Sequence, residues 1–74
     1  MLNDLDTVAL TRDLPEAGLV AGDVGAVVHV YGAGAAFEVE FVDLKGETIA
    51  LVTLPPEALR PVAPREIAHA RAVA

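Results

Sequence analysis

Two glutamates on one predicted strand come nearest, in type and spacing, to catalytic chemistry. Glu38 and Glu40 are two positions apart, so in a strand they share a face about 7 Å apart. Carboxyl pairs near this separation serve as acid, base or nucleophile in glycoside hydrolysis. That chemistry requires a cleft that removes water from a carboxyl group, and we find no insertion that would form one. We therefore interpret both glutamates as a solvated outer face.

The other residues that could do chemistry are scattered. His29 and His69 could be a base or metal ligands, but no second cluster stands at ligand spacing, so surface histidines are the simpler interpretation. Serine and cysteine are both absent, which excludes the commonest nucleophilic triads. The four glycines within 22–34 lead into strands, so they indicate turns and bulges rather than a phosphate loop. We expect no enzyme, no cofactor and no metal.

The charge of the chain bears on the kind of partner it can bind. Eleven acidic residues face five basic ones, giving a net charge of −6, and all but one of the acids precede residue 63. Such a surface repels nucleic-acid backbones and anionic membranes, and it attracts basic proteins. The start MLNDLD lacks the positive charge and apolar run of a secretory signal, and no stretch has the length of a membrane span. We expect a cytoplasmic protein.

Seventy-four residues, 54% of them hydrophobic, suffice for one small domain. Alternation and turn residues predict strands over 7–11, 24–31, 36–43, 47–54 and 60–62, with a long loop over 12–22 and a short helical turn over 55–59. The clearest pattern is at 37–41, where the apolar residues Phe37, Val39 and Phe41 alternate with the two glutamates. Burying unpaired carboxylates is costly, so the apolar face must be the core.

Two of these strands are harder to orient. In 24–31, Gly25 suggests a bulge or a close backbone approach. Strict alternation then predicts one face of Val24, Ala26, Val28 and Val30 and another of Val27, His29 and Tyr31. In 47–54 both faces are apolar, and alternation alone does not decide which one points inward. This apolar surplus is either covered by the C-terminal segment or used for a homodimer or another protein.

The C-terminal segment is alanine-rich. Pro64 suits a first helical position and Glu66 the first turn. We predict a short helix that docks through Ile67, Ala70 and Val73 or Ala74. The predicted organisation is a barrel over 1–62 and a C-terminal helix or tail over 63–74.

The stretch from about Asp6 to Val62 resembles a bacterial SH3-like domain family of unknown function. The resemblance lies in DTVALTRDLP, GDVGAVVHVY, EVEF, the TL pair at 53–54 and the RP pair at 60–61. It implies an all-β fold, a small five-stranded SH3-like barrel with a short C-terminal helix. Members resemble short acidic stand-alone proteins, some encoded beside toxin- or nuclease-like genes, which implies an antitoxin-like or immunity-like role. GDVGAVVHVYG also looks like KOW motifs and the barrel of the nitrile hydratase beta subunit.

These observations favour a non-catalytic protein-binding module that presents an acidic face to a basic partner, such as a toxin. The expected partner-binding residues are Asp13, Glu16, Asp23, Glu38, Glu40 and Glu47, which steer the encounter, with Tyr31 and Ile67 adding contact. Two alternatives stay open. One is an accessory or structural subunit of an enzyme complex, and the other is a KOW-like nucleic-acid binder, which the scarcity of basic loop residues and surface aromatics disfavours.

Overall fold

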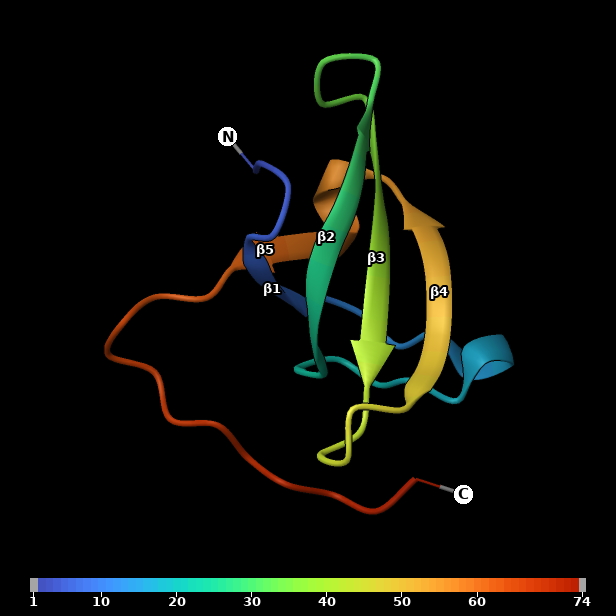
Figure 1. The fold of residues 1–74 in the computed structure, drawn as a ribbon, viewed down its shortest axis with the longest axis vertical. Coiled ribbons are helices and arrows are strands. Elements are labelled where there is room, and N and C mark those ends of the chain that lie inside the picture. The colour runs from blue at the N-terminus through green and yellow to red at the C-terminus, as the bar shows by residue number, and fades with distance from the viewer. Residues whose placement is uncertain (1, 74) are drawn as a thin grey trace.

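A computed structural model describes residues 2–73 of the chain. It is all-β, with five antiparallel strands and only two single-turn 3-10 helices (Figure 1). In chain order the elements are β1 (Thr7–Leu10), η1 (Pro15–Ala17), β2 (Val24–Tyr31), β3 (Ala36–Val42), β4 (Thr48–Leu54), η2 (Pro56–Ala58) and β5 (Leu59–Pro61). The expected strands are therefore confirmed to within two residues at their ends.

The strands form one open sheet in the order β4-β3-β2-β1-β5. Figure 1 shows β2, β3 and β4 running side by side, while β1 and β5 cross behind them. No strand pairing joins β4 to β5 within residues 2–73, so the expected barrel is not closed. The physical reason is the length of the last strand, because β5 has three residues and ends at Pro61, which cannot donate to a ladder.

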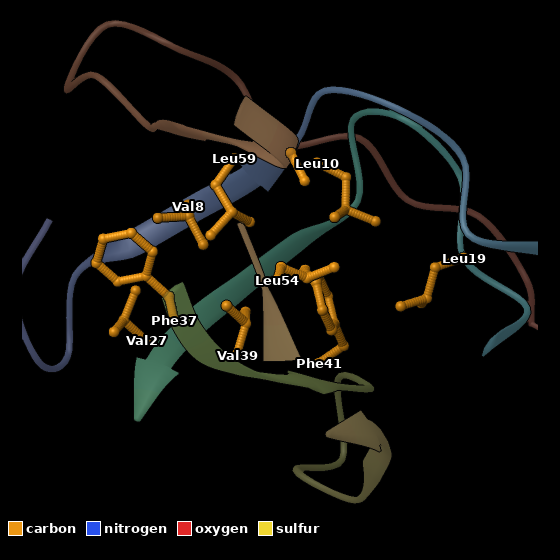
Figure 2. Close-up of a cluster of buried hydrophobic side chains, with 10 residues drawn as sticks. Val8, Leu10, Leu19, Val27, Phe37, Val39, Phe41, Leu54 and Leu59 are labelled. Atoms are coloured by element: carbon orange, nitrogen blue, oxygen red, sulfur yellow. The ribbon is translucent and has the colours of Figure 1, made fainter. Parts of the chain in front are cut away.

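The core lies between the two parts of the bent sheet (Figure 2). Phe37, Val39 and Phe41 of β3 are buried, as the alternation with the glutamates predicts. They pack with side chains from β1, β2, β4, η2, β5 and the β1–β2 loop, namely Val8, Leu10, Leu19, Val27, Leu54, Ala58 and Leu59. Aliphatic residues and two phenylalanines thus make the whole buried cluster.

The structure corrects the predicted faces of β2. Its register against β3 shifts between Val27 and His29, so Val28 is an extra residue without a partner of its own. Such a bulge reverses the alternation. Val27 is therefore fully buried, whereas His29 and Tyr31, which strict alternation placed with it, are exposed.

Register also resolves the faces of β4. Ala50, Val52 and Leu54 lie opposite the inward residues Phe41, Val39 and Phe37 of β3, so they form the inner face. Leu51 and Thr53 point outward, opposite Glu40 and Glu38. Leu51 is 55% exposed.

The predicted C-terminal helix is absent from residues 63–73, which run as an irregular extended tail around the sheet (Figure 1). Predicted docking residues Ile67 and Val73 are exposed, and Ala74 lies outside the described residues. A helix of this length is marginal without packing. Two ion pairs, Arg60 with Glu66 and Asp23 with Arg71, hold the tail in its extended path instead.

Gly25 marks a close approach of β2 to the core face of β3. An added Cβ would lie 2.8 Å from Cγ1 of Val39, 2.9 Å from the carbonyl oxygen of Glu40 and 2.9 Å from Cδ1 of Phe41. The bulge lies further along the strand, so close approach, and not a bulge, is the reason for this glycine.

We expect Gly25→Ala to lower the free energy of unfolding by about 1–3 kcal/mol, because the methyl group overpacks a site that includes backbone. Denaturant unfolding measures this cost. Val24→Ala, at the neighbouring and exposed position of the same strand, is the control and should cost clearly less. Equal effects of the two substitutions would show that the approach at Gly25 is not a packing constraint.

Candidate functional site

The outer face of β2, β3 and β4 brings together three of the predicted partner-binding residues. Glu38 and Glu40 of β3 are half-buried and point away from the core. The Tyr31 hydroxyl of β2 donates to Oε1 of Glu38 over 2.5 Å. On the other side, the Thr48 hydroxyl of β4 donates to Oε2 of Glu40 over 2.6 Å. Each carboxylate is thus held in place by a neighbouring strand, while its remaining acceptor capacity stays available.

The bulge in β2 is what positions Tyr31. Had the strand alternated without interruption, Tyr31 would lie on the face of Val27 and point into the core. The reversal turns it outward, where its ring meets that of His29 edge to face, with 4.4 Å between centroids. His29 lies opposite Glu38 in the register. An aromatic pair therefore lies directly beside Glu38.

This outer face is open rather than hollow. Two clefts of the described residues lie elsewhere, and neither is lined by Glu38 or Glu40. The exposed apolar side chains of Val28, Val42 and Leu51 belong to the same three strands. Glu38 and Glu40, both half-buried, therefore present their oriented carboxylates beside these apolar side chains.

A second group of predicted partner-binding residues lies on the β1–β2 loop, where two of them accept hydrogen bonds from the loop backbone. Oδ1 of Asp13 accepts from the backbone N–H of Ala21 over 2.8 Å. Oδ2 of Asp23 accepts from the N–H of Val20 over 2.9 Å. Glu16 is exposed on η1. The carboxylates of Asp13 and Asp23 are thus engaged within the loop.

Asp23 also holds the tail. Arg71 donates from Nε to Oδ1 over 2.8 Å and from Nη2 to Oδ2 over 2.5 Å. Nη2 donates further to the carbonyl oxygen of Gly18 over 3.1 Å. The hydrogen bonds from Arg71 are the largest cause of the lowered pKa of Asp23. Burial opposes them, and the bond from the N–H of Val20 and the charge of Arg71 lower the pKa further. The contribution of the pair to stability is therefore present at neutral pH and is lost as the pH falls through the lowered pKa.

The last two predicted residues lie apart from both groups. Glu47 is exposed at the β3–β4 turn, where its backbone N–H donates to Oδ1 of Asp43 over 2.9 Å. Ile67, in the tail, is 96% exposed. Sequence reasoning missed Thr48 and Arg71. Thr48 comes to lie opposite Val42 because the register of β4 against β3 shifts between Phe41 and Val42, which regular alternation does not reveal. No signal in the sequence links Arg71 to Asp23, 48 positions earlier.

Among residues 2–73 no group of three or more His, Cys, Asp or Glu side chains could hold a metal ion. In the same range, no helix has the length and apolar character needed to cross a membrane.

An open antiparallel sheet of five strands defines the class of this protein as a small all-β domain. Residues 4–61 match the family described as "Domain of unknown function (DUF4926)", and the chain belongs to this family. The match covers all five strands and ends where the tail begins. No curated protein matches the chain, and no solved structure matches it.

The hydrogen bond to Glu38 raises the pKa of Tyr31, because it favours the neutral phenol and the carboxylate repels the phenolate. We expect Glu38→Gln to move this pKa back towards its ordinary value of 10.0. The chain has one tyrosine and no tryptophan, so ultraviolet absorbance during a pH titration reports Tyr31 alone. The raised pKa also means that the contact stabilises the fold below that ordinary value and is lost as the pH rises above it.

Glu40→Gln removes the same charge from the same strand face but leaves the bond between Tyr31 and Glu38 in place. It is therefore the matched control, and its Tyr31 titration should stay close to that of the parent protein. Identical curves for Glu38→Gln and the parent would show that the hydroxyl does not donate to Glu38 in solution.

Proposed function

We propose that this protein is a non-catalytic module that binds a basic protein through the acidic outer face of β2, β3 and β4. The observation that carries the proposal is the arrangement of Glu38 and Glu40. Both carboxylates are oriented by hydrogen bonds from adjacent strands, yet neither is in a cleft. Oriented charges on an open sheet favour recognition over chemistry, because a partner finds them already arranged.

Charge and surface composition support the same function. A net charge of −6 steers basic partners towards the protein and repels nucleic acids. The aromatic pair and the exposed apolar residues of the same strands supply contact area beside the charges. The resemblance to short acidic proteins of toxin-associated genes makes an antitoxin-like or immunity-like role the specific form of the proposal. We also propose that the fold is a variant of the SH3-like barrel in which the sheet is not completely closed.

The test compares Glu38→Gln and Glu40→Gln with Glu57→Gln, an exposed glutamate on η2 that changes the net charge equally. The binding partner to use is a purified basic protein that is encoded by a gene adjacent to the gene of this protein. We expect either β3 substitution to weaken binding about three- to tenfold, mainly by slowing association, and to reduce its salt dependence.

Glu57→Gln should leave the affinity nearly unchanged. If all three substitutions weaken binding equally, net charge alone is responsible and the β3 face is not the site. If the adjacent products bind with no dependence on salt or on any of these glutamates, an acidic recognition face is wrong.

The free edge of β4 favours a second candidate, a subunit that assembles through apolar contacts. The sheet formed by residues 2–73 has two edges, β4 and β5. The β5 edge is three residues long and contains Arg60 and Pro61, two features that block strand addition. The β4 edge has seven residues, TIALVTL, without charge or proline. In the described residues its recorded backbone pairing is with β3 alone, so its outer N–H and C=O groups can accept another strand.

A second copy fits this edge because an antiparallel pair centred on Leu51 opposes only apolar residues and threonines. Leu51→Lys would place like charges opposite each other and should abolish any concentration-dependent rise in mass measured by light scattering. Leu44→Lys, at a turn residue that is 98% exposed, should not. Because apolar contacts are weakly screened, the association should persist at high salt. A protein that stays monomeric at high concentration would contradict self-assembly through β4.

A further inference from the structure

The β1–β2 loop holds the guanidinium group of Arg71 with three acceptor oxygens. Both carboxylate oxygens of Asp23 and the carbonyl oxygen of Gly18 receive its N–H groups. We propose that this loop is an arginine-binding site, which the protein's own tail occupies until an arginine of the partner displaces it. The inference rests on the proposed function, since it assigns one contact of the basic partner and a means of regulating it.

The acceptors are fixed by the loop itself, not by Arg71. Oδ2 of Asp23 also accepts from the N–H of Val20, which orients the carboxylate. The backbone of Asp23 accepts from Leu10 of β1 over 2.9 Å, which ties the loop to the sheet. Gly18 has a φ of 71°, a left-handed conformation that turns the chain at the end of η1. A pre-formed site of this kind loses little conformational entropy when an arginine binds.

Arginine is the ligand that this geometry selects. Two parallel N–H···O bonds to one carboxylate match the planar fork of a guanidinium, and lysine cannot make them at the same time as the bond to Gly18. The site is also partly shielded, since the side chains of Asp23 and Arg71 are exposed by only 17% and 32%. The bonds are therefore less screened than those of a fully exposed pair.

The tail fills the charged part of the site but not the space beside it. A cleft of about 220 Å³ lies between the tail and the outer side of β1, β2 and β5. Ala9, Gly22 and Val24 line its sheet side, while Ile67 and Ala68 line its tail side. Ile67 remains 96% exposed, so it covers the rim without entering. A partner segment that joins an arginine to an apolar side chain able to enter this cleft would make more contact than the tail does.

The tail is consequently a competitor that can be displaced. A surface pair of this kind is worth at most about a fivefold bias towards the bound state. At that limit about one sixth of the molecules have a free site, which lowers the apparent affinity for an external arginine about five- to sixfold. Figure 1 shows how the tail could leave without disturbing the sheet, because it runs outside the strands after β5. It also follows the last residue of the family match.

The test adds the tail sequence to the protein as a separate peptide. A fluorescent peptide copying Ile67–Val73 is titrated into the full-length protein and into full-length Arg71→Ala, in which the site is vacant. We expect the peptide to bind Arg71→Ala about fivefold more tightly than the parent. A peptide with lysine in place of arginine should bind Arg71→Ala at least about threefold more weakly than the arginine peptide. Adding Asp23→Asn to Arg71→Ala should abolish the preference for arginine.

Amide chemical shifts in the presence of the arginine peptide provide a second measurement that does not depend on folding of the Asp23 variant. They should change at Gly18, Gly22 and Asp23 in Arg71→Ala. Equal affinity of the parent and Arg71→Ala, equal affinity of the two peptides, or shifts confined to other residues would overturn the arginine site. If this happens while a basic partner still depends on Glu38 and Glu40, the proposed function stands without it. If the β3 dependence fails as well, both are wrong.

Discussion

Burial of Phe37, Val39 and Phe41 is the constraint on which the rest of the structure depends. They stand on β3, the strand between β2 and β4, and fill the core with residues of every other strand. Because side chains on a strand alternate strictly, burying these three sends Glu38 and Glu40 to the outer face. A shift of one residue would bury two carboxylates and expose two phenylalanines, which no local rearrangement could offset. The same alternation of residues 37–41 therefore determines both the core and the acidic face.

The same reasoning shows what could be predicted and what could not. Alternation at 37–41 and the turn residues around Gly46, whose φ is 87°, were sufficient to locate the β3–β4 hairpin and its outward glutamates. The bulge at Val28 was not predictable. An extra residue does not change the composition of the strand, and 24–31 has apolar residues on both predicted faces, so the sequence does not show where the alternation reverses. Yet this bulge brings Tyr31 to Glu38. The two glutamates of the candidate surface could therefore be predicted from the sequence. The outward position of Tyr31 and His29 became clear only from the register of β2 against β3.

The prediction of a C-terminal helix was wrong for a different reason. Alanine content and Pro64 favour a helix locally, but a helix of this length needs a surface on which to pack. The β1–β2 loop instead offers acceptors for an arginine at Asp23 and Gly18. A helix beginning at Pro64 rises only about 1.5 Å per residue, whereas an extended chain reaches roughly twice as far. The extended path lets Arg71 reach the loop, and a contact 48 positions apart leaves no local signal.

The acidic face and the free β4 edge are neighbours, which limits what kind of strand can pair there. Leu51 lies opposite Glu40 in the register, so a strand added to β4 continues the row that contains this glutamate. A second copy would bring its own Glu40 into that row, beyond the two Leu51 residues, and add its full negative charge. A foreign strand with a lysine or arginine at that position would reach across Leu51 towards Glu40 instead. At the β4 edge of residues 2–73, the charge of Glu40 would therefore repel a second copy and attract a strand that carries a basic residue.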